Sequence, residues 1–299
     1  MTNVAFEGND CPSGKDWLTS HPANDPISQK AAVLFAALLE KMHEHHASRL
    51  VIAVSGGSGV GKSSTANLFR DYLEDIGIGC ALIGGDEYPY RTPVQNDAER
   101  LRILRQAGVK GMLQQGVWST DAWHELKELQ DAMVDADPKY DAVYPWHKVY
   151  LDYGRKALAT YLGSEAEQDY ADMQQLIDAF HRGETKIPLR KLGDGEADFH
   201  YEVGDFSHKQ VLLIEWTHAG NPTLKGIDIN LFLYSSPEET LERRKRRGRN
   251  ANTDTPLIAL VLELEQIMLN ENAKHADMIQ LMDGELLTAK TYQERVGKK

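Results

Sequence analysis

A glycine-rich segment between an apolar run and a lysine constrains the fold of this chain more than any other feature. Residues 51–54, Val-Ile-Ala-Val, are all apolar, and Gly-Gly-Ser-Gly-Val-Gly-Lys-Ser follows at 56–63. A short, wholly apolar run is typical of a strand buried in the middle of a parallel sheet. Residues 63–76 repeat apolar side chains at helical spacing. The segment therefore predicts a strand, a tight loop and a helix in succession.

The loop has the spacing Gly-x-x-x-x-Gly-Lys-Ser of a phosphate-binding loop. Glycines let a backbone wrap closely around phosphate oxygens, and the following helix adds N–H donors and a positive dipole end. Lys62 is expected to reach the β- and γ-phosphates of a nucleoside triphosphate, and Ser63 to bind Mg²⁺. The alternative is a flexible Gly/Ser turn, which would not require strand, spacing, lysine and helix to coincide. The predicted nucleotide-binding residues are Gly56, Gly57, Ser58, Gly59, Val60, Gly61, Lys62, Ser63 and Ser64.

Further short apolar runs extend this unit into an α/β fold. They lie within 80–84, 210–216, 229–236 and 276–284, separated by segments with helical spacing. Strands that alternate with helices favour a P-loop NTPase-type parallel sheet flanked by helices. We expect residues 91–208 to form a largely helical insertion on the substrate side of one domain that spans 50–299. Residues 1–49 are expected to be an N-terminal arm, irregular to about residue 26, and a helix.

Composition narrows the choice of partner and compartment. The 299 residues include 33 Lys and Arg against 45 Asp and Glu, a net charge of −12, which disfavours general nucleic-acid binding. The two cysteines form no disulfide framework, and no apolar run is long enough for a membrane span or a signal peptide. We therefore expect a cytoplasmic protein whose partner is a small-molecule acceptor, without nucleic acid or membrane. A homodimer stays open.

Motifs elsewhere bear on the reaction. A GTPase would need an Asn-Lys-x-Asp guanine motif and an Asp-x-x-Gly switch, and the chain contains neither. Motor ATPases usually have an acidic strand that ends in Asp-Glu, whereas the candidate strand here ends Leu-Leu-Ile-Glu-Trp at 212–216. These differences favour a kinase.

The chain resembles the uridine kinase, phosphoribulokinase and pantothenate kinase branch of P-loop kinases, from about residue 50 to 284. The resemblance rests on the loop, on Gly-Gly-Asp-Glu-Tyr at 84–88, on a strand that ends in Glu215, on the arginine-rich segment 235–250 and on Ala-Asp-Met-Ile at 276–279. It implies that Asp86 handles the acceptor hydroxyl. The chain departs from the family at Trp216, where glycine is expected, and at Asp-Glu-Tyr-Pro, which puts uridine itself in doubt.

Chemistry gives the two acidic residues roles that fit the resemblance. A hydroxyl that attacks a γ-phosphoryl group needs a nearby carboxylate to orient it and accept its proton. Asp86 follows a predicted strand and is the candidate base; the alternative is an ordinary turn residue. Glu215 is expected to act on Mg²⁺ through water or on the substrate; the alternative is a charged residue that simply ends a strand.

Cationic and aromatic side chains complete the predicted site. The resemblance implies a lid helix, whose start is marked by the capping box Ser-Pro-Glu-Glu at 236–239. Arg243 and Arg247 on this helix are predicted to neutralise charge on the transferred group; a solvated helix face is the alternative. The predicted acceptor-binding residues are Tyr88, Arg91, His147 and Arg190.

Together these features predict an ATP- and Mg²⁺-dependent kinase that phosphorylates a hydroxyl of a small metabolite such as a nucleoside, sugar or vitamin-like compound. Adenylylsulfate kinase is an alternative, because residues 84–91 also resemble the Asp-Gly-Asp-Asn segment of that family. A non-catalytic nucleotide sensor is a second alternative, and Trp216 is the residue that supports it.

Overall fold

The computed structural model of the chain describes residues 11–22, 25–193, 199–236, 238–240 and 255–296. The strands are β1 (Leu50–Gly56), β2 (Cys80–Gly84), β3 (Lys186–Leu192), β4 (Phe199–Asp205), β5 (Val211–Glu215), β6 (Ile229–Leu233), β7 (Met278–Gln280) and β8 (Leu286–Leu287). The helices are α1 (Gly14–Ser20), α2 (Pro26–His43), α3 (Lys62–Asp75), α4 (Pro93–Gln114), α5 (Thr120–Asp131), α6 (His147–Tyr161), α7 (Tyr170–His181), α9 (Pro256–Asn272) and α10 (Ala289–Arg295).

A six-stranded sheet in the order β2-β5-β1-β6-β7-β8 forms the centre of the molecule. Strands β2, β5, β1, β6 and β7 are parallel, and only β8 runs antiparallel to its neighbour. In register, Val54 of β1 lies opposite Glu215 of β5 and Leu231 of β6. The expected mostly parallel sheet with flanking helices is confirmed.

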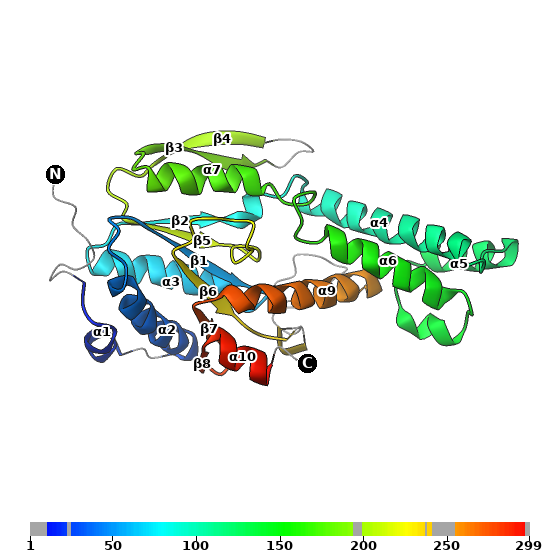
Figure 1. Ribbon diagram of the computed structural model, residues 1–299, viewed down its shortest axis with the longest axis horizontal. Helices are drawn as coiled ribbons and strands as arrows, with labels where there is room; N and C mark the ends of the chain where they lie inside the picture. The colour runs from blue at the N-terminus through cyan, green and yellow to red at the C-terminus, as the bar shows by residue number, and fades with distance from the viewer. Residues whose placement is uncertain (1–10, 23–24, 194–198, 237, 241–254, 297–299) are drawn as a thin grey trace.

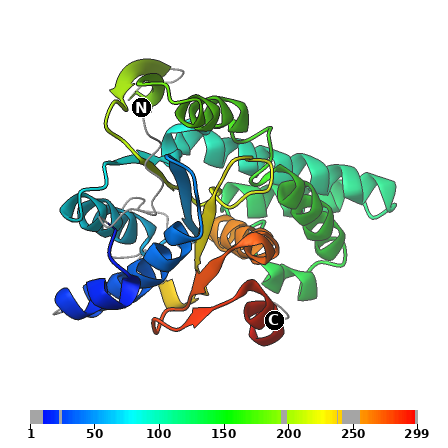
Figure 2. The ribbon, with the colours of Figure 1, turned by 60° about the vertical axis from the view of Figure 1, so that its left-hand side comes forward.

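Alternate side chains of β1 point to opposite faces of the sheet. Leu50, Ile52 and Val54 are fully buried in one apolar cluster with side chains of α2 and α3. Val51 and Ala53 are buried on the opposite face, in a cluster with side chains of α7. Figures 1 and 2 show these helices on either side of the sheet. Because β1 is covered on both faces, its residues 50–54 are all apolar, as its sequence indicates.

The N-terminal region is more ordered than its sequence indicates. Helix α1 packs on α2, and its Trp17 is 1% exposed. The Trp17 ring lies 4.6 Å from that of Phe35 and 4.8 Å from that of Tyr72. The expectation of an irregular arm up to residue 26 is therefore wrong for 14–20, because one large aromatic side chain ties this short helix to the core.

Residues 91–208, expected to be largely helical, contain α4, α5, α6 and α7 together with an antiparallel hairpin of β3 and β4. Helices α4 and α6 pack against each other and, with α5, extend away from the sheet (Figure 1). The hairpin lies beyond α7 on one side of the molecule. Pro188 lies within β3, and a proline usually argues against a strand unless the strand is at an edge. That residue explains why the sequence did not indicate the hairpin.

None of the helices in the described part of the chain is long and apolar enough to cross a lipid bilayer.

Candidate active site

The phosphate-binding loop connects β1 to α3 at the carboxyl edge of the sheet. The nine predicted nucleotide-binding residues run from the last residues of β1 into the first turn of α3. Gly56 has φ 147°, and a Cβ atom there would lie 2.4 Å from the carbonyl oxygen of Leu233. Gly61 precedes α3 with φ 112° and provides no side-chain cap. The first N–H groups of the helix therefore lack helical partners and suit an anion such as phosphate.

Lys62 and Ser63 occupy the first turn of α3, at the mouth of this loop. The Lys62 ammonium donates a hydrogen bond to the Gly57 carbonyl oxygen, 3.1 Å away, so the lysine lies over the loop. Ser63 Oγ donates to Glu215 Oε2 over 3.1 Å. The hydroxyl and the carboxylate are both oxygen ligands, the kind that Mg²⁺ prefers. The donor chemistry of this pair therefore fits the predicted metal.

Asp86 follows β2 within the short 3₁₀ turn Gly85–Glu87. Gly84 pairs with Glu215 in β5, and Glu215 pairs with Val54 in β1. Since neighbouring strands lie about 4.8 Å apart, Asp86 is one strand beyond Glu215 and two strands from the loop. Its side chain is exposed and makes no hydrogen bond or ion pair with any residue that the structure describes. The carboxylate is thus exposed to solvent just beyond the end of β2.

Tyr88, predicted to bind substrate, is a core residue in the structure. It is 2% exposed, and its ring lies 6.4 Å from that of Trp216. Burial raises the pKa of its hydroxyl, with a smaller contribution from the Asp172 charge. A ring without exposed surface favours a packing role over the predicted substrate contact.

Trp216 itself, the departure from the family pattern, fills space left by a glycine. A Cβ atom on Gly85 would lie 2.0 Å from Trp216 Cγ. The Trp216 side chain is 2% exposed and also contacts the rings of Tyr170 and His218. Gly85 directly precedes Asp86, so the tryptophan supports the turn that carries the candidate base.

The arginines predicted to bind the acceptor both have partners within the protein. Arg190 is 6% exposed; its Nη1 lies 2.9 Å from Asp169 Oδ2, and its Nη2 donates to the Pro89 carbonyl oxygen over 3.0 Å. These contacts tie β3 to the segment after β2 and favour a structural role, contrary to the prediction. Arg91 donates to the Tyr161 hydroxyl over 3.1 Å. It is only partly buried, so part of its side chain remains exposed.

His147 lies at the opposite end of α6 from Tyr161, the partner of Arg91. Its side chain is fully buried, with Nδ1 2.6 Å from Asp141 Oδ1 and Nε2 3.2 Å from the Asp135 carbonyl oxygen. The fifteen residues of α6 separate it from Tyr161, the partner of Arg91, a length of about 20 Å. Burial and two hydrogen-bond partners favour a core role at the start of α6 over the predicted acceptor contact.

The predicted lid arginines, Arg243 and Arg247, lie outside the described residues.

A cluster of charged residues near Lys62 was not predicted from the sequence. Arg100 of α4 forms ion pairs with Glu167, 2.8 Å away, and with Glu265 of α9, 3.2 Å away. His218 lies close enough that the Glu167, Arg100 and Lys62 charges influence its pKa, which burial lowers to about 4. An acidic residue among the apolar positions of α9, in Leu-Glu-Leu-Glu-Gln at 262–266, was the only signal in the sequence.

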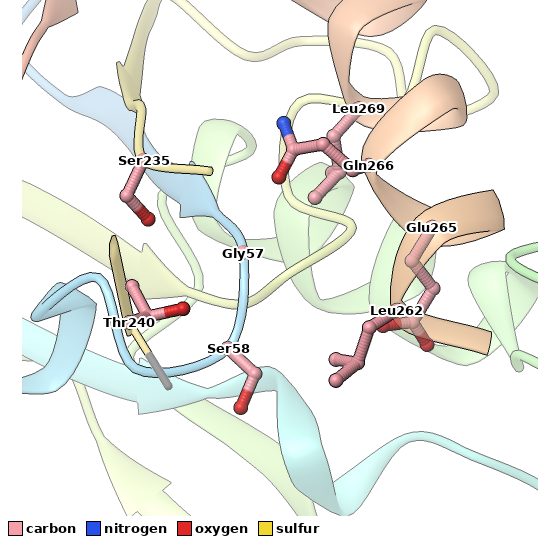
Figure 3. A pocket seen from close by; sticks show the side chains of 8 residues that line it. All are labelled: Gly57, Ser58, Ser235, Thr240, Leu262, Glu265, Gln266 and Leu269. Atoms are coloured by element: carbon pink, nitrogen blue, oxygen red, sulfur yellow. The ribbon is translucent and has the colours of Figure 1, made fainter. Parts of the chain in front are cut away.

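Helix α9 lies beside the phosphate-binding loop and encloses a small pocket with it. Loop residues Gly57 and Ser58 form one wall. The opposite wall consists of side chains of α9, among them Glu265 and Gln266 (Figure 3). This pocket adjoins the loop, so the structure brings α9 next to the expected position of the nucleotide.

No family model matches the chain. It is 35% identical over 237 residues to the bifunctional alpha-galactosidase/sucrose kinase AgaSK of Mediterraneibacter gnavus, a match that covers 79% of this chain and 20% of that protein. The chain thus spans about a fifth of the length of this relative.

Two solved structures are similar at lower identity. A possible uridine kinase from Bacillus stearothermophilus is 15% identical, with a TM-score of 0.41 over 85% of this chain and 98% of that one. The YGR205w protein is 10% identical, with a TM-score of 0.47 over 89% of this chain and 98% of that one. Both TM-scores lie below 0.5, so neither structure adds support.

The motif and the sequence relative lead to the same assignment. The phosphate-binding loop lies between β1 and α3 of a mostly parallel sheet, and the 35% identity extends over most of the chain. With this loop in this setting and a relative named in part for a sucrose kinase, the chain is similar to P-loop kinases.

Proposed function

We propose that the protein transfers the γ-phosphate of ATP to a hydroxyl group of a sugar, with sucrose as the first acceptor to test. The observation that carries this proposal is the row of Lys62, Ser63, Glu215 and Asp86 along the carboxyl ends of β1, β5 and β2. The relative is named for an α-galactosidase and a sucrose kinase. Of these two activities only a kinase requires a phosphate-binding loop, which supports the choice of a sugar acceptor.

Different side chains of the protein have separate roles in phosphate transfer. The loop N–H groups and Lys62 bind and orient the phosphates. Ser63 and Glu215 would hold Mg²⁺, which supplies positive charge to the phosphate oxygens when bound. Asp86 orients the acceptor hydroxyl and takes its proton as the oxygen attacks. Because Asp86 lies two strands from the loop, we place the acceptor between them.

We further propose how the chain is organised around this reaction. Residues 50–299 act as the kinase domain, with 91–208 on the acceptor side and Arg243 and Arg247 as lid residues. Arg91 remains a candidate acceptor contact. ATP and Mg²⁺ are the proposed cosubstrate and cofactor, a small molecule is the proposed partner, and the cytoplasm is the proposed compartment.

The alternatives differ in a measurable way. Adenylylsulfate kinase would use the same loop with a different acceptor. A nucleotide sensor would bind ATP without transfer, and the feature that favours it is Trp216 in place of glycine. The close fit of Trp216 against Gly85 offers a packing reason for that residue instead.

The test measures acceptor-dependent ADP release from ATP and Mg²⁺ with sucrose, fructose, glucose, uridine, pantothenate and adenylylsulfate. We expect release with a sugar, and near-complete loss in Lys62→Ala, because a principal positive charge at the transferred phosphate is removed. Lys148→Ala is the control, since its side chain is 68% exposed and pairs within α6. Release with adenylylsulfate alone would favour the first alternative. ATP binding without release for any acceptor would favour the sensor.

A further inference from the structure

Arg100 connects the acceptor-side helix α4 to α9 beside the phosphate-binding loop. Its Nε lies 2.9 Å from Glu167 Oε1, and its Nη2 lies 3.2 Å from Glu265 Oε1. Its Nη1 makes a longer contact of 3.4 Å with Asp97. Nη2 also lies 2.8 Å from Glu167 Oε1, so the two glutamates share this nitrogen while Glu167 alone contacts Nε.

Glu167 is a fixed anchor for this arginine. Its side chain is fully buried and also accepts hydrogen bonds from the Gly163 N–H over 2.6 Å and from Asn96 Nδ2 over 2.9 Å. A carboxylate with so many partners stays ionised, and its pKa is lowered by the Arg100 charge and the Gly163 hydrogen bond, against the effect of burial. Arg100 is therefore oriented whether or not Glu265 is its partner.

Glu265 lies between Arg100 and the loop. It lines the pocket formed with Gly57 and Ser58 (Figure 3). Burial raises its pKa, and the positive charges of Arg100 and Lys62 oppose that rise. The same two charges act on His218. Glu265 and His218 therefore lie within electrostatic reach of both Arg100 and Lys62.

From this arrangement we propose that Arg100 is a catalytic residue that binds the γ-phosphate, and that Glu265 occupies the place of that anion until the nucleotide binds. The inference rests on the proposed nucleotide site. A guanidinium edge binds carboxylate and phosphate oxygens in the same way. A carboxylate next to a bound triphosphate would be repelled by it. Arg100 therefore exchanges Glu265 for phosphate while it keeps Glu167.

The test compares the binding of ADP with that of the non-hydrolysable ATP analogue AMP-PNP, each with Mg²⁺, by calorimetry. Only AMP-PNP carries the third phosphoryl group. Loss of a charge-assisted contact in Arg100→Gln should weaken AMP-PNP binding on the order of 10- to 100-fold and change ADP binding little. Glu265→Gln removes the competing anion and should strengthen AMP-PNP binding more than ADP binding.

A second ion pair of helix α9 provides the matched control. Arg155 of α6 and Glu263 of α9 form a two-pronged pair at 2.7 and 3.0 Å, two residues before Glu265 in sequence. The Glu263 side chain is 55% exposed. Arg155→Gln and Glu263→Gln should leave the ratio of the two affinities as in the wild type.

The outcomes separate this inference from the proposed function. Equal weakening of ADP and AMP-PNP in a folded Arg100→Gln protein overturns the inference, and so does an unchanged affinity ratio in Glu265→Gln. If Arg100→Gln fails to fold because Glu167 loses its partner, Glu265→Gln decides alone, since it removes no contact of Glu167. A wild-type protein that binds neither nucleotide overturns the proposed function and this inference together.

Discussion

The Ser63 hydroxyl donates a hydrogen bond to the Glu215 carboxylate over 3.1 Å, which joins the first turn of α3 to the end of the neighbouring strand β5. The two residues are far apart in sequence, and the parallel pairing of β1 with β5 brings them together. An oxygen ligand on the first turn of α3 and another at the end of β5 suit a hard cation. This contact supports the prediction that Glu215 acts on Mg²⁺.

Glu215→Gln should raise the Mg²⁺ concentration needed for half-maximal turnover by roughly 10- to 100-fold, the usual effect of losing a group that orients a metal ligand. The amide keeps the shape but loses the negative charge that favours the cation. A Mg²⁺ titration of turnover at saturating ATP checks this. Glu202→Gln, at an exposed position of β4, is the control. An unchanged Mg²⁺ requirement in Glu215→Gln would place the metal elsewhere.

Asp86→Asn should lower turnover by about 10²–10⁴-fold, the range for general-base catalysis. A loose transition state would put the effect at the low end, because positioning then matters more than proton removal. ATP affinity should change far less, since the loop and Lys62 remain. The measurement pairs ATP titration with acceptor-dependent turnover.

The neighbouring acid provides the control for Asp86. Glu87 Oε2 accepts a hydrogen bond from the Leu192 N–H over 2.6 Å, and a glutamine oxygen can accept the same bond. Glu87→Gln should therefore keep near-normal turnover. If Asp86→Asn also stays near the wild type, Asp86 is only a turn residue and Glu215 becomes the better candidate for the base.

The sequence predicted those parts of the site that depend on local chain geometry. The loop from Gly56 to Ser64 and the positions of Asp86 and Glu215 follow from where strands end, because parallel strands bring their carboxyl ends to one edge. Whether the other predicted residues can reach a substrate depends on how the rest of the chain buries them. Arg190 was predicted to contact the acceptor, but it pairs with Asp169 and with Pro89, 21 and 101 residues away. The partners of His147, Asp141 and Asp135, are nearer in sequence, and burial rather than spacing distinguishes it.

Ion pairs between distant segments are hidden for the same reason. Arg100 meets Glu167, 67 residues away, and Glu265, 165 residues away. Nothing in the spacing of a single sequence indicates such contacts. Strand-like runs and loop spacing predict the sheet and the phosphate site, whereas side-chain pairing between helices requires the structure.

Gly85→Ala should destabilise the protein by about 1–3 kcal/mol or more, because a Cβ atom there would lie 2.0 Å from Trp216 Cγ in a packed core. Gly84→Ala is the matched control, since a Cβ on Gly84 would meet no atom within 4 Å. Denaturant unfolding of both variants checks the difference. The penalty for Gly85→Ala should shrink in a Trp216→Leu background. Equal stability of the two alanine variants would contradict the packing reason for Trp216.

The stability of the protein should fall as the pH falls from about 6.5 toward 4, and His218 should account for much of that loss. Burial lowers the pKa of His218 from 6.5 to about 4; the nearby Glu167 charge opposes this, and Arg100 and Lys62 add to it. His218 is 4% exposed, and its Nδ1 has no hydrogen-bond partner in the described part of the chain. Between these two pH values the unfolded chain binds the proton and the folded chain does not, so acid favours unfolding.

The loss is absent above the unfolded pKa and complete below the folded one, and amounts to on the order of 3 kcal/mol. Thermal unfolding of wild type and His218→Gln between pH 7.5 and 4 measures it. His218→Gln should lose less stability on acidification, because its side chain does not titrate. His200→Gln, at an exposed position in β4, should follow the wild-type profile. Identical pH profiles for wild type and His218→Gln would mean that His218 already accepts a proton in the folded protein, with Glu167 as the nearest charge to stabilise it.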